Sequence, residues 1–244
     1  MHCLIIANGP APSLEQIHQA TNQADLVIAA DGGTAHTLAA GLYPDLVVGD
    51  LDSLAPEVVK DLRAAEVSII HHPARKNETD LELALHEAAR RGATRITLLG
   101  AVGGRLDQTL SNIFLLTLPA FVGIPIRLLT ADEEAFVVRE QAHITGEVGD
   151  IVSLIPLTPR VEGVTTRGLE YPLENATLHF GPSLGISNEL RVAEAEVKVS
   201  AGILLVIHGR RRPQPAPSAA PTAEPAASAT GAPEPSTAKT NGGG

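Results

Sequence analysis

The sequence predicts a doubly wound α/β domain built on a parallel sheet over residues 1–130, followed by a smaller all-β sandwich domain over residues 131–210. In the first part, short apolar runs alternate with amphipathic stretches, which is the order of strands and helices in βαβ units. After residue 130 the pattern changes to short β-type segments separated by Gly and Pro, without a helical pattern. From residue 211 to 244, Pro, Ala, Ser, Thr and Gly predominate, so we expect a disordered tail.

Six apolar runs in the first part are predicted to be strands. Several are apolar at consecutive positions, so both faces of each strand must be covered, which favours a parallel sheet with helices on both sides. The runs are Cys3–Ile6, Leu26–Ala30, Leu46–Val48, Val67–Ile70, Ile96–Leu99 and Ile126–Leu129.

The helix that follows Thr79 has the clearest predicted boundaries. Thr79 and Glu82 have the spacing of a capping box, in which both side chains satisfy backbone N–H groups of the first turn. Gly92 is suited to end the helix because glycine adopts the left-handed conformation without strain. A second, more apolar helix is expected over Thr109–Leu118.

The second part contains six segments with β-type composition. Their short length and the turns between them are typical of a sandwich or jelly roll. The segments are Phe136–Arg139, Ile151–Ile155, Val161–Thr166, Ala176–Phe180, Leu190–Val199 and Ile203–His208.

Composition and charge limit the possible partners. The formal net charge is −10, so the protein repels phosphate backbones and we expect no nucleic-acid partner. A phosphate ligand would need a metal ion between it and the protein carboxylates. The single cysteine, Cys3, lies in an apolar run and indicates a reducing compartment. No run has the length of a signal peptide or a membrane span, so we expect a cytoplasmic protein without a membrane partner.

Three carboxylates follow predicted strands. Asp31 comes after Leu26–Ala30, and Asp50 and Asp52 come after Leu46–Val48. Ligands of open α/β sheets bind at the carboxyl ends of strands, and a hard divalent ion such as Mg²⁺ takes one or two carboxylates together with substrate phosphates. Each Asp alone is also compatible with an Asx turn or a helix N-cap, but Gly32 and Gly33, which allow backbone amides to approach a ligand, favour a binding site.

Two further segments carry charge at the same predicted edge. Asp80 opens the capped helix, where an acid also stabilises the helix dipole; the same helix end favours bound phosphate, and Lys76 adds a positive charge. The glycine-rich turn 100–104, after the strand Ile96–Leu99, is followed by Arg105 and Asp107. A glycine-rich turn alone indicates little, but this one carries a charged pair at the sheet edge where ligands bind.

Four motifs resemble the thiamine pyrophosphokinase family in order and in spacing. They are Ala-Asp-Gly-Gly at 30–33, Pro-Asp-Leu-Val-Val-Gly-Asp-Leu-Asp-Ser at 44–53, Thr-Asp at 79–80 and Gly-Gly-Arg-Leu-Asp-Gln at 103–108. The similarity extends through 163–173 and 185–189, and covers about residues 3–208. It implies an α/β nucleotide-binding domain, a β-sandwich, and a homodimer whose active sites form between subunits.

The resemblance also implies roles for individual residues. Mg²⁺ and the phosphates of ATP, the co-substrate, are assigned to the four aspartates, with Asp50, Asp52 and Asp80 as the metal ligands and Asp31 beside them. Gly32, Gly33, Lys76 and Thr79 join this nucleotide side of the site. Arg105 and Asp107 are placed at the reacting end, with Asp107 orienting or deprotonating the acceptor hydroxyl, and Ser187 and Asn188 hold thiamine. The thiamine hydroxyl would attack the β-phosphorus of ATP, and AMP would leave.

Two positions depart from the family pattern, and two other functions stay open. Asn77 and Gln108 stand where many bacterial members have Asp and His, so no metal role is transferred to position 77 and activity is not expected to depend on position 108. The chain contains no Trp, so stacking on thiamine must come from a residue such as Tyr171 or Phe180. The alternatives are a silent sensor that binds nucleotide or thiamine, and a diphosphokinase that acts on another alcohol.

Overall fold

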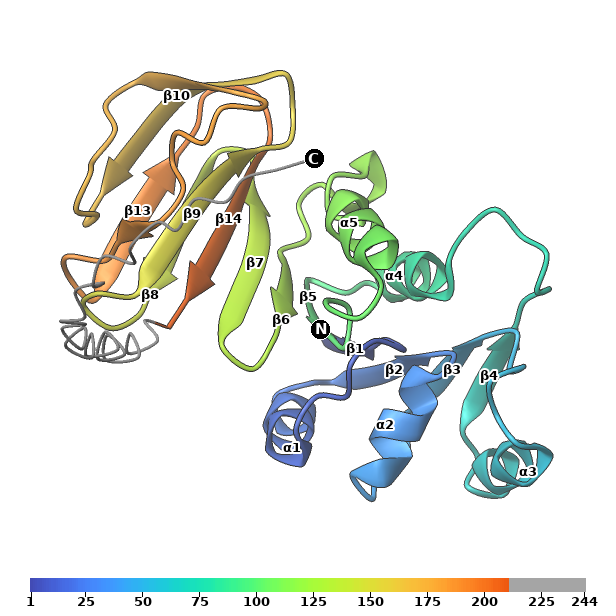
Figure 1. The fold of residues 1–244 in the computed structure, drawn as a ribbon. Coiled ribbons are helices and arrows are strands. Elements are labelled where there is room, and N and C mark those ends of the chain that lie inside the picture. The colour runs from blue at the N-terminus through green and yellow to red at the C-terminus, as the bar shows by residue number, and fades with distance from the viewer. Residues whose placement is uncertain (211–244) are drawn as a thin grey trace, which may run out of the picture. The chain divides into compact units, whose positions relative to one another are not determined.

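The computed structural model describes residues 1–210, which contain two β-sheets and five α-helices (Figure 1). The tail predicted over 211–244 lies outside the described residues. The first part alternates strands and helices as the apolar pattern predicted. Its elements are β1 His2–Ile6, α1 Leu14–Asn22, β2 Leu26–Ala30, α2 Gly33–Ala39, β3 Leu46–Gly49, α3 Pro56–Ala64, β4 Ser68–His71, α4 Asp80–Arg90, β5 Arg95–Leu99, α5 Leu106–Leu115, the 3₁₀ helix η1 Pro119–Phe121 and β6 Ile126–Leu129.

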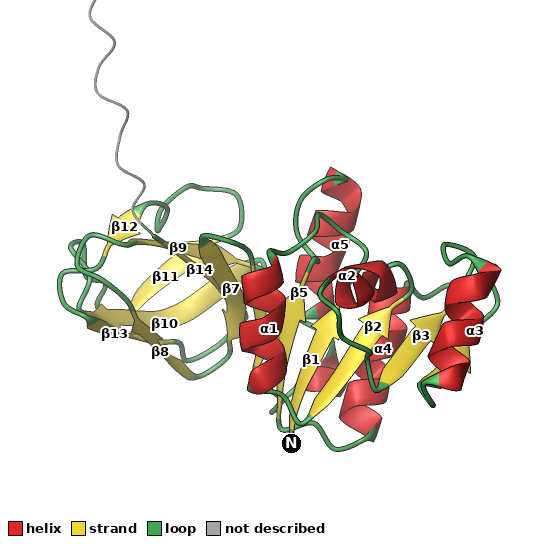
Figure 2. Cartoon of the chain, turned by 90° about the horizontal axis from the view of Figure 1, so that it is seen from below, coloured by secondary structure: helices red, strands yellow, loops and turns green. Residues whose placement is uncertain are grey.

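The strands of the first part are parallel and lie in the order β6-β5-β1-β2-β3-β4. Alternate residues of β1 contact different helices: Cys3 and Ile5 belong to the core that contains α4, whereas Leu4 and Ile6 pack with Ile17 of α1. The helices α1, α2 and α3 lie along one face of the sheet, and α4 and α5 lie along the other (Figure 2). The chain reverses its direction across the sheet between β1 and β5, which makes the carboxyl ends of these two strands the topological switch point.

Capping side chains determine where two of the helices begin. Ser13 and Gln16 form a complete capping box at α1. At α4, the Thr79 hydroxyl accepts a hydrogen bond of 3.1 Å from the backbone N–H of Glu82, which is one of the two bonds of the predicted capping box. Gly92 follows this helix with φ of 84°, the left-handed conformation that ends a helix.

The second part is entirely β within the described residues. Its strands are β7 Glu133–Val138, β8 Gln141–Thr145, β9 Ile151–Pro156, β10 Arg160–Arg167, β11 Ala176–His179, β12 Asn188–Glu189, β13 Glu194–Lys198 and β14 Leu204–Gly209. Strands β7, β14, β9 and β12 extend the parallel sheet with antiparallel pairings, giving ten strands in the order β12-β9-β14-β7-β6-β5-β1-β2-β3-β4. A separate four-stranded sheet has the order β11-β10-β13-β8.

The antiparallel end of the large sheet forms a sandwich with the small sheet. Phe136 and Val206 of the large sheet share a buried core with Val161 and Val197 of the small one. Alternate residues of the same strands, such as Ala135 and Leu205, belong instead to the core that contains α4 and α5. The period of two in these strands therefore joins both cores through one continuous sheet. The division into domains at residue 130 stays a prediction, because the sheet continues across it through the pairing of β6 with β7.

The sequence predictions and the structure differ most clearly at three segments. Strand β8 was not expected; its polar residues alternate with only two apolar ones, and pairing with β13 and burial of Ile144 stabilise it. The strand expected over Leu190–Val199 is shorter in the structure, where it is β13 Glu194–Lys198, and Leu190 forms an isolated bridge with Leu169. The two-residue strand β12 precedes this segment, and the chain passes from one sheet to the other between β12 and β13. The second helix begins at Leu106 rather than Thr109 and ends at Leu115. No helix within residues 1–210 is long and apolar enough to cross a membrane.

Candidate active site

The two loops at the switch point contact each other through their backbones. The Gly9 N–H donates to the carbonyl oxygen of Gly100 at 2.8 Å. A Cβ at Gly9 would lie 2.2 Å from that oxygen, and a Cβ at Gly100 would lie 2.6 Å from the Ala7 oxygen, so both positions require glycine. A cavity of about 670 Å³ opens beside these loops, and within residues 1–210 its lining comes from positions 7 to 112.

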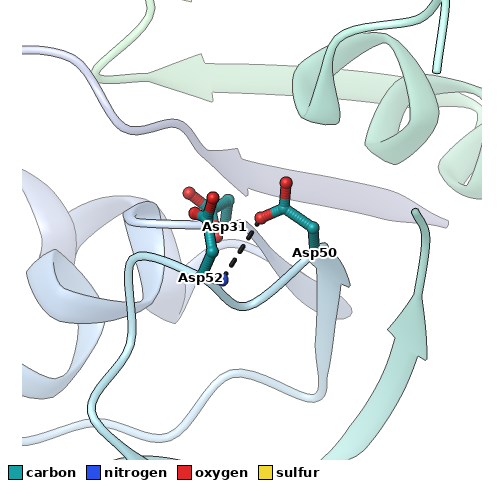
Figure 3. Close-up of side chains that lie close together, drawn as sticks. All are labelled: Asp31, Asp50 and Asp52. Atoms are coloured by element: carbon teal, nitrogen blue, oxygen red, sulfur yellow. Dashed lines mark hydrogen bonds between the residues drawn. The ribbon is translucent and has the colours of Figure 1, made fainter. Parts of the chain in front are cut away.

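Three carboxylates gather at the ends of β2 and β3, next to this cavity (Figure 3). One oxygen from each of Asp31, Asp50 and Asp52 lies within 4.8 Å of the others. Asp31 lines the cavity and is 8% exposed, and its Oδ1 atom is buried without a hydrogen-bond partner. The pKa of Asp52 is raised, chiefly by the charge of Asp50 and by a hydrogen bond with it, and to a smaller extent by burial. Converging negative charge is costly unless a cation lies between the carboxylates.

The donor set of this cluster fits a magnesium ion. It offers only carboxylate oxygens, which are the ligands that Mg²⁺ prefers, and the unpartnered Oδ1 of Asp31 is available for a metal or its water. The local backbone is shaped for the convergence: Asp31 and Leu51 have φ of 44° and 63°, which ordinary residues rarely adopt. A Cβ at Gly49 would lie 2.9 Å from the Cβ of Asp31, so the end of β3 can approach Asp31 only as glycine.

Close packing explains why residues 32 and 33 are glycines, which the sequence alone did not reveal. A Cβ at Gly33 would lie 2.0 Å from the carbonyl oxygen of Ile6, and one at Gly32 would lie 2.2 Å from the Asn8 side chain. The start of α2 therefore packs directly on the end of β1. This contact places Asp31, the residue before the two glycines, at the cavity.

The N-terminus of α4 reaches the cavity with Thr79 and Asp80. Backbone N–H groups of a first helical turn favour an anion, so this end suits a phosphate. Asp80 lies outside the cluster of three carboxylates. Its Oδ1 atom forms an ion pair with the Nζ atom of Lys76 at 2.8 Å, and the side chain of Lys76 is 12% exposed. The structure thus groups Asp50 and Asp52 with Asp31 and pairs Asp80 with Lys76.

Arg105 and Asp107 form a two-bond ion pair. The guanidinium of Arg105 donates to the two carboxylate oxygens of Asp107 at 3.1 and 2.6 Å. Arg105 lines the cavity, whereas Asp107 borders a separate shallow groove on α5 together with Phe114. The hydrogen bond from Arg105 lowers the pKa of Asp107, which makes this carboxylate a weaker base.

Ser187 and Asn188 lie in the second part, away from the lining of the cavity. Ser187 has φ of 58°, and its backbone N–H donates to the hydroxyl of Ser153 at 3.1 Å. The buried side chain of Asn188 accepts the N–H of Tyr171 at 3.0 Å and donates to the Tyr171 carbonyl at 2.8 Å. Asn188 therefore fixes the backbone of Tyr171, whose ring is 69% exposed.

Comparison with known proteins supports the resemblance seen in the motifs. The family model described as "Thiamin pyrophosphokinase, catalytic domain" matches residues 17–128, and "Thiamin pyrophosphokinase, vitamin B1 binding domain" matches residues 139–204. The chain is 32% identical over 205 residues to thiamine pyrophosphokinase of Bacillus subtilis, a match that covers 83% of this chain and 96% of that protein. The chain belongs to the thiamine pyrophosphokinase family. Its members are enzymes that transfer diphosphate, so the chain is classed as a kinase.

Solved structures of the thiamine pyrophosphokinase family have the same fold. The crystal structure of the Bacillus subtilis protein superposes with a TM-score of 0.76 at 30% identity and covers 87% of this chain and 100% of that chain. A family protein from Enterococcus faecalis gives 0.75 at 31% identity, with the same coverage. The likeness covers both the part with the mixed sheet and the part with the separate antiparallel sheet, which is consistent with two domains.

Two polar side chains that line the cavity were not found by sequence reasoning. Asn8 follows β1 and Asn112 lies on α5, and both line the cavity. Neither belongs to a charged motif. Asn112 is 7% exposed and donates to the Ala101 carbonyl at 2.8 Å. An amide within the apolar pattern of the predicted helix Thr109–Leu118 is the signal that would have indicated it.

Proposed function

We propose that the chain transfers the diphosphate group of ATP to the hydroxyl group of thiamine in a Mg²⁺-dependent reaction that releases AMP. The observation that carries this proposal is the convergence of Asp31, Asp50 and Asp52 beside the cavity at the switch point. Three converging carboxylates at such a position favour a bound cation, and nucleotide phosphates complete the coordination of Mg²⁺ in proteins. The family membership supplies thiamine as the acceptor.

Three carboxylates and the N-terminus of α4 are assigned to different parts of the bound nucleotide and its metal ion. Asp31, Asp50 and Asp52 would hold the metal ion, which would neutralise charge on the phosphate oxygens. The N–H groups at the start of α4, capped by Thr79, receive a phosphate. Lys76 holds Asp80 toward the cavity by its ion pair and adds positive charge at this helix end.

Arg105 is the residue that we assign to the transferring diphosphate. It borders the cavity and is exposed, so the guanidinium can exchange Asp107 for a phosphate without breaking buried contacts. Arginine offers two parallel donors to phosphate oxygens and keeps its charge at all relevant pH values. Asp107 is assigned to orient Arg105 and the acceptor hydroxyl, since its lowered pKa suits a general base poorly.

The thiamine end is assigned to the segment around β12. Asn188 uses its amide to hold Tyr171, so Asn188 acts on thiamine by presenting the exposed ring of Tyr171 for stacking on the vitamin. Ser187 lies next to this clamp and adds a hydroxyl. We therefore expect Asn188→Ala to raise the KM for thiamine and to leave the KM for ATP nearly unchanged.

We further propose a homodimer in which each active site takes residues from both subunits. Within residues 1–210, the cavity is lined by positions 7 to 112, whereas Ser187 and Asn188 lie elsewhere in the chain. The helix α5 also exposes an apolar stripe next to Arg105, formed by Leu106, Leu110 and Phe114, which are 72%, 46% and 51% exposed. Such a stripe is suited to a protein interface, and a second copy can bring its own β12 segment to the cavity.

Mixing two variants that are impaired in different parts of the site tests the shared site, at a thiamine concentration well below the KM of Asn188→Ala. The variant Asp50→Ala/Asp52→Ala loses the metal end and Asn188→Ala weakens the thiamine end, and a mixed dimer contains one site with neither change. Activity that reappears after the two variants are unfolded and refolded together supports the shared site. A monomer by light scattering, or no recovery in proven mixed dimers, contradicts it.

The direct test of the function follows AMP and thiamine diphosphate together. Purified protein is incubated with ATP, Mg²⁺ and thiamine, with Asp50→Ala/Asp52→Ala as control. Formation of both products that depends on thiamine and is lost in the control supports the proposal. If AMP formed only with another alcohol, the proposed diphosphate transfer would stand, but thiamine would not be the acceptor. Binding of ATP or thiamine without AMP would favour a silent sensor.

The cytoplasmic location expected from the sequence stays a prediction.

A further inference from the structure

The loop between β5 and α5 has a backbone that needs external support. Three of its glycines have positive φ: 66° at Gly100, 100° at Gly103 and 70° at Gly104. Glycine loses more conformational freedom on ordering than other residues, so a loop of this composition holds one conformation only if anchors restrain it. Arg105 follows directly, so the position of its side chain at the cavity depends on these anchors.

Two side chains of α5 act as anchors for this loop. Asn112 Nδ2 donates to the carbonyl oxygen of Ala101 at 2.8 Å. The hydroxyl of Thr109 accepts the N–H of Gly103 at 3.0 Å and donates to the carbonyl of Arg105 at 3.2 Å. The first bond restrains the chain where it leaves β5, and the other two restrain it where it enters α5.

The burial of Asn112 indicates that its amide is present for the loop. The residue is 7% exposed, and Leu115 on the same helix belongs to the main core. A buried amide is costly without hydrogen bonds, whereas leucine, of similar size, would pack there without that cost. The bond to Ala101 supplies the compensation and ties the helix to the cavity wall.

We propose that Thr109 and Asn112 are positioning residues for diphosphate transfer, which act by holding the loop so that Arg105 faces the phosphates. This proposal rests on the proposed function, because it requires Arg105 to act on the transferring group. Its consequence is specific: the two anchors affect the reaction through Arg105, so their effect should vanish once Arg105 is removed.

A double-mutant cycle tests this dependence. Thr109→Val is close in size and removes the hydroxyl, and we expect kcat to fall by about 10- to 100-fold with KM changed by less than about threefold. Thr109→Ser keeps the hydroxyl and should return kcat to within about threefold of the parent protein. In an Arg105→Ala background, Thr109→Val should change kcat by less than about twofold.

Two further variants separate positioning from folding. Thr117→Val is the matched control, because the Thr117 hydroxyl donates to the Phe114 carbonyl at 2.8 Å and does not line the cavity, so its kcat should stay within about twofold. Asn112→Leu removes the bond to Ala101 while it keeps the branching and the number of heavy atoms of the side chain, and it replaces Thr109→Val in the cycle if that variant does not fold. Circular dichroism and thermal melting establish that each compared variant is folded.

The outcomes are distinguishable. Loss of kcat that disappears in the Arg105→Ala background supports the proposal. Effects of Thr109→Val and Arg105→Ala that multiply in the double variant overturn it, because the anchors then act independently of Arg105. If the unmodified protein forms no thiamine diphosphate, the proposed function fails first, and this is known before any variant is compared.

Discussion

Replacing His208 with glutamine removes the cation from a buried charge network that supports the segment assigned to thiamine. His208 on β14 lies between two carboxylates, with Nδ1 at 3.3 Å from Glu134 Oε1 and Nε2 at 3.1 Å from Asp150 Oδ2. The side chains of His208 and Asp150 are 10% and 8% exposed. Arg127 on β6 pairs with Glu134 from the other side.

The pKa shifts give the sign of the pH dependence. The hydrogen bond from His208 to Glu134 raises the pKa of His208 against the effect of burial, and Asp150 adds to the rise. Burial raises the pKa of Glu134, but hydrogen bonds from His208 and Arg127 outweigh it, so the net pKa is lowered. The stabilisation by His208 is therefore complete below its unfolded pKa of about 6.5 and is lost as pH rises through the higher folded pKa. The contribution of Glu134 is present above about pH 4.3 and is lost as pH falls through its lower folded pKa.

The size of the effect follows from burial. Removing one partner of a buried ion pair costs about 3–5 kcal/mol, and the glutamine amide recovers about 1 kcal/mol through one neutral hydrogen bond. At pH 6 we expect His208→Gln to lower the free energy of unfolding by about 2–4 kcal/mol. For a chain of this size this corresponds to roughly 4–16 °C in Tm. As pH rises through the raised pKa of His208 toward 9.5, the difference should shrink toward about 1 kcal/mol.

Urea unfolding of both proteins between pH 6 and pH 9.5 measures this difference. The exposed His18 on α1 provides the matched control, and His18→Gln should have no comparable effect. Asp150 and Leu190 are also joined through their backbones at 2.8 Å, next to Asn188, so we expect the KM for thiamine to rise more than the KM for ATP. Equal pH slopes of stability for the parent protein and His208→Gln would refute the charge argument.

Three further predictions concern the cavity. Gly9→Ala places a Cβ 2.2 Å from the Gly100 oxygen, so we expect about 1–3 kcal/mol less stability in urea unfolding and weaker ATP binding by calorimetry; unchanged values would exclude this contact as a constraint. Asp107→Asn should lower kcat by less than about tenfold, whereas a loss beyond about a hundredfold would point to a general base. Asp31→Asn should weaken Mg²⁺ activation at least about tenfold in a metal titration, and an unaltered titration would remove Asp31 from the metal site.

Local signals were sufficient for much of the fold. Strands β2 and β6 have the bounds that their apolar runs predicted, since each run is delimited by polar or turn-forming residues. The Thr79 cap and the left-handed Gly92 were also predicted, because the first- and last-turn hydrogen bonds that they serve involve residues only a few positions apart. Strand β8 was missed because its stability depends on pairing with β13, whose residues lie 49 to 57 positions further along the chain.

For the candidate site too, some features follow from local sequence and others depend on the tertiary structure. The sequence by itself determined which residue types stand at the ends of β2, β3, β4 and β5, since the motifs and the strand periodicity are local, and it determined the family through their order. Only the tertiary structure decided that Asp31 joins Asp50 and Asp52, that Asp80 is held by Lys76, and that Asn112 anchors the loop before Arg105. These contacts depend on strand order and on the side-chain conformations permitted by packing, and both are set by interactions between segments far apart in the chain.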